Sequence, residues 1–376
     1  MPTPDTTRFP ALAGVQRILA VSSCKGGVGK STTAVNTALA LSRYGLRVGL
    51  LDADVYGPSL PTLLRPEQTT LYQNAEGLIQ PLECLGLKVM SFGWIDPEQQ
   101  RGAAILRGPM VSQVVSQLAT RVDWGELDYL VIDFPPGTGD IQLTLTQQLP
   151  IHAAVIVTTP QNLSFVDVVK GIQMFDTVKV PTVAVVENMS YFQCGSCGEK
   201  QKVFGEGARE KLIRQFGFQY TFEIPIDPRL SQCGDEGHPL VARWPEDPVT
   251  QIFYELAEKV HGEINRLMQD NPGIPQLTYN VGQNCELTYP DGRMVEISPL
   301  ELRFACRCAA CVSEYTGEQL IKKEDLDPEV YPTEILPVGR YAASVKWSDD
   351  HRSSIYPYDY LQKKFDPPVT SPDLEA

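Results

Sequence analysis

The sequence has no long hydrophobic run and no excess of positive charge. No stretch approaches the roughly 20 consecutive apolar residues that a membrane-spanning helix needs, so we expect no membrane span. The 46 acidic residues outnumber the 32 basic residues and give a formal net charge of −14. Because binding to nucleic acid or to an anionic membrane requires clustered lysine and arginine, this balance argues against both as the main partner.

The sequence also lacks a recognisable targeting segment and an even spread of cysteines. Its first residues are polar, without the apolar core of a secretory signal or the Arg- and Ser-rich composition of a transit peptide, so we expect a cytoplasmic location. Among the nine cysteines, a C-x-x-C pair begins at Cys194 and a C-x-C-x-x-C triplet begins at Cys306. Without an export signal, such spacing favours metal or redox chemistry over a disulfide framework.

Strand-like and helix-like segments alternate over residues 17–268. A helix is expected to begin near Asp247 with Pro248 in its first position, and an Ala- and Leu-rich helix follows a glycine-rich turn after the first strand. This alternation predicts an α/β fold in which a mostly parallel sheet carries helices on both faces. The expected buried strands are 17–23, 47–54, 128–137, 153–159 and 182–189.

The pattern changes after residue 268. Residues 269–279 contain Pro and Gly and are expected to form a linker, whereas residues 280–365 have short strand-like pieces such as 340–348 without strand–helix alternation. We therefore predict a small second domain that is α+β or mostly β. An N-terminal tail is expected over residues 1–16 and a disordered tail over residues 366–376.

A phosphate-binding loop is predicted directly after the first strand. Its sequence, CKGGVGKST, fits the pattern G-x-x-x-x-G-K-S/T except that Cys24, expected to be a small packing residue, replaces the first glycine. The glycines let backbone N–H groups converge on phosphate oxygens, Lys30 should reach the β- and γ-phosphates, and the Ser31 hydroxyl should bind Mg²⁺. A glycine-rich turn that binds nothing is the alternative. The predicted nucleotide-binding set is Cys24, Lys25, Gly26, Gly27, Val28, Gly29, Lys30, Ser31 and Thr32.

Acidic residues end two of the predicted strands. Asp52 and Asp54 end the second strand, and Asp133 ends the third. Ligands bind at the carboxyl ends of strands in open α/β sheets, so these carboxylates should lie near the bound phosphates. We expect Asp133 to hold Mg²⁺ through water, with Asp52 in the magnesium shell.

The segment KGGVGKS resembles the deviant Walker ATPases, which include MinD and ParA proteins, the nitrogenase iron protein and the Mrp-type carriers. The resemblance implies that Lys25 reaches the phosphates bound by a second copy, so that two copies form a homodimer around the nucleotides. It gives catalytic roles to Lys25, Lys30, Asp54 and Asp133, with Asp54 in the first switch and residues 135–140 in the second. The alternatives are a solvated surface lysine at 25 and a structural turn at 135–140.

The resemblance also implies contacts to the base of the nucleotide. In relatives, an Asn at a strand end and a later segment with Pro and Asp line the base, and these positions are Asn188, Pro225 and Asp227 here. An Asn at a strand end is also a common turn residue. ATP as the nucleotide follows from the resemblance.

Two thiolates, Cys194 and Cys197, cannot complete a four-ligand metal site within one chain. A homodimer would supply four thiolates, which suits a four-iron four-sulfur (4Fe-4S) cluster on the twofold axis. An intersubunit zinc site and a redox disulfide remain alternative interpretations of the pair.

Four segments together closely resemble the Mrp family of iron–sulfur carrier and scaffold ATPases over about residues 15–265: 52–61, 107–110, 133–140 and 188–198. The resemblance implies an ATP-binding carrier that assembles a 4Fe-4S cluster and transfers it to apo-proteins, with slow ATP hydrolysis as the switch. Its expected partners are cluster donors and apo acceptor proteins.

A second metal site is expected in the C-terminal segment. Cys306, Cys308 and Cys311 supply three close thiolates, and His351 could complete a tetrahedral zinc site. The segment is similar to the N-terminal domain of gamma-butyrobetaine hydroxylase, which also follows the ATPase in the plastid high-chlorophyll-fluorescence branch of the Mrp family and there binds structural zinc. Unliganded core cysteines and a second cluster site are the other interpretations.

The sequence offers two alternative functions from other classes. A MinD- or ParA-like positioning ATPase without metal cargo would need an amphipathic membrane-targeting helix or a basic DNA-binding face, and neither is apparent in the sequence. A zinc-dependent interaction scaffold with a vestigial ATPase would not need the intact set of Lys25, Lys30, Ser31, Asp54 and Asp133.

Overall fold

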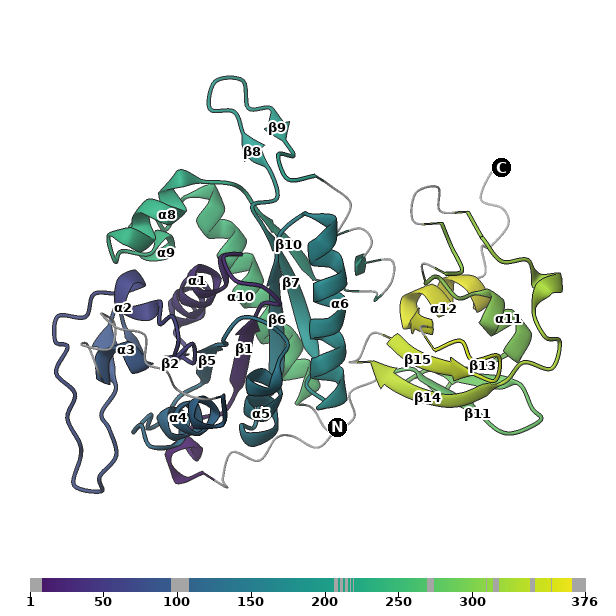
Figure 1. The fold of residues 1–376 in the computed structure, drawn as a ribbon, viewed down its shortest axis with the longest axis horizontal. Helices are drawn as coiled ribbons and strands as arrows, with labels where there is room; N and C mark the ends of the chain where they lie inside the picture. The colour runs from purple at the N-terminus through teal and green to yellow at the C-terminus, as the bar shows by residue number, and fades with distance from the viewer. Residues whose placement is uncertain are drawn as a thin grey trace, which may run out of the picture. The chain divides into compact units, whose positions relative to one another are not determined.

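The computed structural model describes residues 9–95, 108–205, 209, 212–213, 216, 218, 220–268, 274–308, 310–313, 318–338, 342–352 and 354–366 (Figure 1). The chain divides into two compact units, Met1–Ala208 with Tyr220–Met268 and Arg209–Gln219 with Gln269–Ala376. Of the expected tails and linker, residues 1–8, 269–273 and 367–376 lie outside the described residues, as does Arg107 of the segment 107–110. Within the described part, residues 10–12 of the expected N-terminal tail form a short 3-10 helix and residues 276–279 of the expected linker form a strand.

The first unit is built around an eight-stranded sheet in the order β10-β7-β6-β1-β5-β2-β4-β3. All neighbouring strands are parallel except β3, which pairs antiparallel with β4 at one edge. Five strands lie where the sequence predicts them, and β3, β4 and β10 are additional. The bounds are β1 Ile18–Ser22, β2 Val48–Asp52, β3 Leu82–Cys84, β4 Leu87–Ser91, β5 Tyr129–Asp133, β6 Ala153–Thr158, β7 Thr182–Asn188 and β10 Thr221–Ile224.

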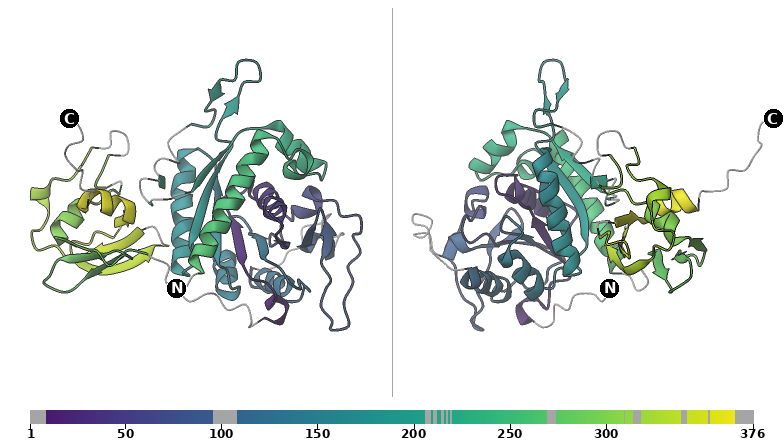
Figure 2. Two further views of the ribbon diagram at one scale, coloured as in Figure 1. Left: turned by 180° about the vertical axis from the view of Figure 1, so that it is seen from behind. Right: turned by 45° about the vertical axis from the view of Figure 1, so that its right-hand side comes forward.

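Helices cover both faces of this sheet, which confirms the predicted fold class (Figures 1 and 2). The strands at its centre are buried along their whole length because both faces are covered. Helices α1 (Lys30–Arg43) and α10 (Pro248–Leu267) pack on one face, and α6 (Asn162–Thr177) lies on the other. The remaining helices are α2 Leu60–Leu63, α3 Phe92–Ile95, α4 Gly108–Thr120, α5 Asp140–Gln148, α8 Pro228–Asp235 and α9 Leu240–Arg243.

Helix α10 begins where the sequence predicts. Asp247 caps its N-terminus, because the carboxylate accepts a hydrogen bond from the N–H of Val249 at 2.9 Å, and Pro248 occupies the first turn, where no N–H donor is needed. The apolar side of the helix, which includes Phe253, Leu256 and Val260, is buried in the core.

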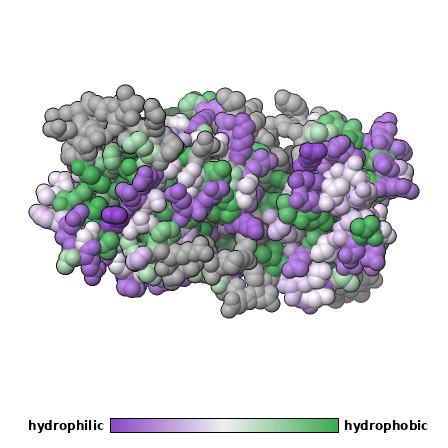
Figure 3. All heavy atoms as spheres, turned by 60° about the horizontal axis from the view of Figure 1, so that its bottom comes forward, coloured by the Kyte–Doolittle hydropathy of each residue, from purple (hydrophilic) through white to green (hydrophobic). Residues whose placement is uncertain are grey.

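Among the described helices, none is long and apolar enough to cross a membrane. On the face drawn in Figure 3, hydrophobic and hydrophilic side chains are interspersed.

A buried histidine at the amino end of β6 predicts a pH-dependent stability. His152 is 7% exposed, and its Nδ1 accepts the N–H of Ile18 at 3.1 Å, which requires the neutral ring. Burial, followed by the charge of Arg17, lowers the pKa of His152 to about 4. Between the unfolded value of about 6.5 and this value the unfolded chain binds the extra proton, so stability falls as pH falls through this window, by about 2 kcal/mol at pH 5.

This contribution is measured by urea unfolding of the wild type and of His152→Asn at neutral pH and near pH 5. The side-chain oxygen of asparagine occupies the position of Nδ1 and can still accept the Ile18 N–H, but it does not titrate. We expect the wild type to lose about 2 kcal/mol more than the variant on acidification. Equal losses in both proteins would show that the folded chain tolerates a protonated His152.

In its described residues between 274 and 366, the second unit contains two three-stranded antiparallel sheets, two short α-helices and a 3-10 helix at Lys323–Asp325. The sheets are β11 Gln276–Tyr279, β12 Cys285–Thr288 and β13 Met294–Ile297, and β14 Pro332–Val338, β15 Ala342–Trp347 and β16 Ser354–Pro357; the helices are α11 Pro299–Phe304 and α12 Tyr358–Phe365. This architecture agrees with the predicted small α+β domain. Its apolar core contains Cys285, Cys306, Cys308 and Cys311.

Candidate functional site

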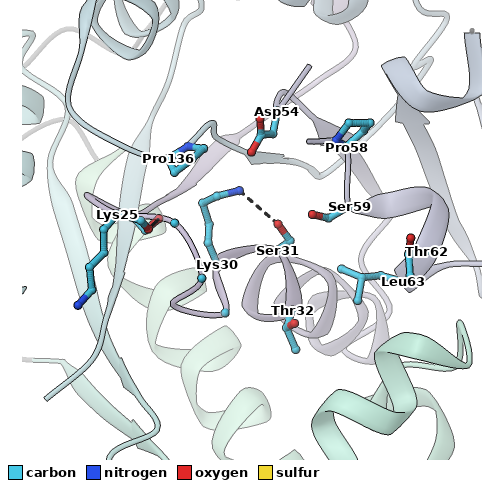
Figure 4. Close-up of a pocket in the computed structure, with 14 residues that line it drawn as sticks. Lys25, Lys30, Ser31, Thr32, Asp54, Pro58, Ser59, Thr62, Leu63 and Pro136 are labelled. Atoms are coloured by element: carbon cyan, nitrogen blue, oxygen red, sulfur yellow. Dashed lines mark hydrogen bonds between the residues drawn. The ribbon is translucent and has the colours of Figure 1, made fainter. Parts of the chain in front are cut away.

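The loop between β1 and α1 borders a pocket of about 400 Å³ (Figure 4). The pocket lies at the carboxyl end of the parallel strands, where ligands bind in open α/β sheets. Three segments line it: the loop itself with the start of α1, the connection from β2 into α2, and the segment after β5. The lining residues are Ser23, Lys25, Gly26, Gly27, Gly29, Lys30, Ser31, Thr32, Asp54, Pro58, Ser59, Thr62, Leu63 and Pro136.

Two glycines give the loop a backbone conformation that other residues rarely adopt. Gly27 and Gly29 have φ of 75° and 85°, in the left-handed region. At Gly29 the constraint is also steric, because a Cβ there would lie 2.2 Å from Nδ2 of Asn188. Asn188, at the end of β7, donates a hydrogen bond from this Nδ2 to the carbonyl of Val28 at 2.9 Å. The loop therefore has a fixed, tightly packed path before α1 begins.

A buried ion pair joins the loop to β5. Nζ of Lys30 lies 2.6 Å from Oδ1 of Asp133 and 3.3 Å from the hydroxyl of Ser31. Lys30 is 7% exposed and Asp133 is fully buried. The structure thus brings together three side chains that the sequence assigns to phosphate and magnesium.

The oxygens around this pair fit a bound Mg²⁺. Oδ2 of Asp133 is buried and has no hydrogen-bond partner among the residues that the structure describes. Buried carboxylate oxygens are normally satisfied, and Mg²⁺ prefers oxygen ligands, including carboxylates and hydroxyls. The Ser31 hydroxyl lies at the first turn of α1, where a helix also favours phosphate. The donor set of Asp133 and Ser31 is therefore suited to a magnesium–phosphate complex.

The two aspartates after β2 have different surroundings. Asp54 lines the pocket, where burial raises its pKa and the charge of Lys30 opposes the rise. Asp52 is fully buried and does not line the pocket; burial, followed by the negative charge of Asp133, raises its pKa to about 7. Its oxygens accept hydrogen bonds from the connection between β2 and α2 and from Ser91.

Lys25 and Cys24 differ in their orientation. Lys25 borders the pocket, but in Figure 4 its side chain points away from Lys30 and Ser31. Cys24 packs against α6: a Cβ at Gly171 would lie 2.6 Å from the sulfur of Cys24, and burial raises the pKa of this thiol to about 11. Cys24 is therefore placed for packing and not for reaction.

The segment after β5 also reaches the pocket. Pro136, from the expected second switch, lines it, and the N–H of Gly137 donates to the carbonyl of Ser23 at 2.9 Å. The side-chain amide of Gln142 in α5 donates to the carbonyl of Pro135. The residue that precedes the phosphate loop and the expected second switch are thus connected directly through their backbones.

The residues expected at the base do not line this pocket. Asn188 supports the loop backbone, as described above, and Pro225 is buried. Asp227 caps α8 by accepting the N–H of Arg229 at 2.9 Å and also forms an ion pair with the Arg229 side chain, which lowers the pKa of Asp227. Arg229, which sequence reasoning missed, pairs with Asp247 as well and joins the N-termini of α8 and α10. Contact with the base remains a prediction for these residues.

Cys194 and Cys197 lie on a hairpin that extends from the carboxyl end of β7 (Figure 1). Its strands are β8 Phe192–Gln193 and β9 Lys200–Gln201. Backbone hydrogen bonds at 2.9 Å close the turn, one from Cys194 to the carbonyl of Glu199 and one from Gly198 to the carbonyl of Cys194. Both thiols are free, and Cys197 is exposed. The N–H groups of Cys197 and Ser196 lower the pKa of Cys194, which favours the thiolate that metals bind.

The second unit gathers three cysteines and a histidine. Nε2 of His351 lies 3.3 Å from the sulfur of Cys306, 3.5 Å from that of Cys308 and 3.7 Å from that of Cys311. All four ligand atoms lie within 4.8 Å of one another. In a tetrahedral site with zinc–sulfur bonds of about 2.3 Å and zinc–nitrogen bonds of about 2.0 Å, sulfur and nitrogen would be about 3.5 Å apart. The four side chains therefore have the spacing of a zinc site.

Two polar groups support these sulfur atoms. Arg303 approaches Cys311 at 3.5 Å and pairs with Asp349 at 2.8 Å, and the hydroxyl of Ser354 donates to Cys306 at 3.2 Å. Hydrogen bonds of this kind orient metal ligands and stabilise thiolates. Sequence reasoning missed Arg303 and Ser354, because only the fold brings them beside the cysteines.

Comparison with known proteins gives matches to both units. The family model described as NUBPL iron-transfer P-loop NTPase matches residues 14–261, and the model described as gamma-butyrobetaine hydroxylase-like, N-terminal, matches residues 279–362. The nucleotide-binding protein of Archaeoglobus fulgidus in complex with ADP is similar in structure, with a TM-score of 0.57 and 38% identity over 66% of this chain and 96% of that one.

Two curated relatives have names that state a function. The Fe-S cluster assembly factor HCF101, chloroplastic, of Oryza sativa is 47% identical over 94% of this chain and 67% of its own length. The iron-sulfur cluster carrier protein of Haemophilus influenzae is 48% identical over 68% of each chain. The chain thus spans about two thirds of the length of these relatives. The motif, the fold and these matches together show that the chain belongs to the family of NUBPL iron-transfer P-loop NTPases.

Proposed function

We propose that the chain is an ATP-dependent carrier that assembles a 4Fe-4S cluster and transfers it to apo-proteins, working as a homodimer. The observation that carries this proposal is the projecting hairpin with free thiols at Cys194 and Cys197 on a P-loop NTPase. Two thiolates are half of the four that such a cluster takes, so a second copy completes the set. The names of the rice and Haemophilus relatives, which state cluster assembly and carriage, support the same cargo.

The nucleotide site follows from the geometry of the pocket. In this proposal Lys30 and the backbone of the phosphate loop bind the β- and γ-phosphates, Asp54 orients the attacking water, and Asp133 with Ser31 holds Mg²⁺, which neutralises charge on the phosphates. Lys25, whose side chain points away from its own pocket, reaches the phosphates of the second copy. Hydrolysis is slow and acts as a switch between two arrangements of the subunits.

In this proposal the end of β7 connects the nucleotide site to the cluster site. The hairpin follows β7, and Asn188 at the end of β7 is bonded to the phosphate loop at Val28. A rearrangement of the loop would therefore reach the hairpin through one strand end, changing the exposure of the cluster and its release to cluster-free acceptors. The Cys₃His group of the second unit holds structural zinc in this proposal, since its spacing fits that metal.

The proposal is tested by anaerobic reconstitution with iron and sulfide. The wild-type dimer should hold about four iron and four sulfide with broad absorbance near 400 nm. Cys194→Ala and Cys197→Ala should each reduce both contents to background, because each variant removes one thiolate from each copy and leaves the dimer with two of the four. Cys84→Ala is the matched control, since Cys84 is buried in the core of the first unit and does not lie on the hairpin.

Two results would contradict this function. A colourless protein that contains only zinc would favour an interaction scaffold. A chain that remains monomeric with Mg²⁺ and ATP while carrying its full iron content would show that the cluster does not need a second copy. Cluster transfer to an apo-ferredoxin, measured with ATP, with ADP and without nucleotide, tests the coupling separately.

A further inference from the structure

The connection from β2 to α2 supplies one wall of the nucleotide pocket. Residues 53–60 contribute Asp54, Pro58 and Ser59 to the lining. The position of the Asp54 carboxylate depends on how this connection is held, because Asp54 lies in the connection itself and not on a regular strand or helix. The hydrogen bonds of its own carboxylate stay within the connection: Oδ1 of Asp54 accepts the N–H of Gly57 at 3.3 Å, and backbone N–H groups of Gly57 and Tyr56 oppose the rise of its pKa that burial causes.

One buried carboxylate holds both ends of this connection. Oδ1 of Asp52 accepts the N–H of Asp54 at 3.0 Å, and Oδ2 accepts the N–H groups of Ser59 at 2.9 Å and Leu60 at 3.1 Å. The hydroxyl of Ser91, at the end of β4, donates to the same Oδ2 at 3.1 Å and accepts the N–H of Gly93 at 3.2 Å. Asp52 and Ser91 are both fully buried.

The carboxylates of Asp52 and Asp133 differ in whether they have an oxygen free to bind a metal ion. Oδ2 of Asp52 already accepts three hydrogen bonds, so its lone pairs are fully used. Oδ2 of Asp133 is buried and accepts none from the described part of the chain. Of the two carboxylates, Asp133 has an oxygen without a hydrogen bond in the described part of the chain, as a magnesium shell needs, whereas both oxygens of Asp52 accept backbone N–H groups.

We infer that Asp52 is a positioning residue, supported by Ser91, that fixes residues 53–60 and thereby places Asp54 at the pocket, and that it does not belong to the magnesium shell. This role replaces the one expected from the sequence. It also gives β4, which contributes nothing to the pocket lining, a place in the site through Ser91. The part of the inference that concerns hydrolysis rests on the proposed ATPase function, and the part that concerns the backbone does not.

The backbone arm uses hydrogen exchange on the full chain without nucleotide. Asp52→Asn places an amide NH₂ against backbone donors, so the amides of Asp54, Ser59 and Leu60 should exchange at least about tenfold faster than in the wild type. Ser91→Ala should accelerate the same amides less, and Ser91→Thr, which keeps the hydroxyl, should leave them close to the wild type. Unchanged exchange in both Asp52→Asn and Ser91→Ala would overturn the inference.

The functional arm compares magnesium dependence. Asp52→Asn should lower kcat at least about tenfold while the Mg²⁺ concentration for half-maximal binding of a fluorescent ATP analogue stays within about twofold of the wild type. Asp133→Asn is the matched variant and should raise that concentration at least about tenfold. An increase of equal size in Asp52→Asn would place Asp52 in the magnesium shell and overturn the inference.

The inference remains testable if Asp52→Asn does not fold or if the proposed function fails. If Asp52→Asn does not fold, the Ser91 variants carry both arms, with Ser91→Ala expected to lower kcat and Ser91→Thr to restore it; equal kcat in both would refute the role of Ser91. If the wild type binds no Mg²⁺ and ATP, the proposed function fails, while the exchange results still decide whether Asp52 holds residues 53–60.

Discussion

Lys30→Met is expected to weaken ATP binding at least about a hundredfold and to destabilise the first unit by about 3–5 kcal/mol. The loss of affinity follows from removing the side chain that reaches the phosphates. The loss of stability has a separate cause: Asp133 is fully buried and its Oδ1 is paired with Lys30 at 2.6 Å, so the variant leaves a buried carboxylate without a counter-charge.

A double-mutant cycle separates these two effects. Adding Asp133→Asn to Lys30→Met removes the unpaired charge and should recover most of the lost stability, measured by urea unfolding, but not the ATP affinity, measured by calorimetric titration. Lys170→Met is the control, because Lys170 is 61% exposed and its ion pair with Asp167 should contribute less than about 1 kcal/mol. A double variant as unstable as Lys30→Met would contradict this account.

Removal of one ligand from the Cys₃His group is expected to destabilise the second unit more than Lys30→Met destabilises the first unit. Cys308→Ala should reduce zinc from about one per chain to background and abolish the cooperative unfolding of this unit, since structural zinc contributes on the order of 10 kcal/mol to the folding of small domains. The stability of the unit should depend on this group because Cys306, Cys308 and Cys311 are themselves part of its apolar core.

The matched control is Cys285→Ala. Cys285 is fully buried in the same core but lies outside the Cys₃His group, so its replacement leaves only a small cavity and should cost about 1 kcal/mol. Zinc is quantified by atomic absorption, and unfolding is followed by calorimetry with and without a strong chelator. Retention of zinc and of normal unfolding in Cys308→Ala would exclude the proposed metal site.

The sequence predicted the site best where local patterns determine it. Buried strands ending in Asp52 and Asp133 and a glycine-rich turn before an Ala-rich helix were sufficient, because parallel strands bring their carboxyl ends to one edge of a sheet. The structure accordingly places Lys30 beside Asp133. The three cysteines and His351 also meet, although they come from distant parts of the second unit.

Roles that depend on distant partners could not be predicted in this way. Ser91 ends a strand that the sequence did not indicate, so its bond to Asp52 was not foreseeable. Asp227 was expected at the base, but its carboxylate caps α8 and pairs with Arg229, which in turn pairs with Asp247. The packing of Cys24 on Gly171 likewise requires knowledge of where α6 lies. The sequence identified Asp52, Asp227 and Cys24, and the tertiary contacts determined their surroundings.

The contact between Asn188 and the phosphate loop has a consequence for how the loop can move. The amide of Asn188 is bonded to the carbonyl of Val28, and it also occupies the space where a side chain at position 29 would be. Cys194 follows Asn188 by six residues, a length of at most about 22 Å of extended chain. A shift of the loop backbone at Val28 therefore strains or breaks this hydrogen bond unless Asn188, at the root of the hairpin, moves with it, so a mechanical route from phosphate to thiol lies within the first unit.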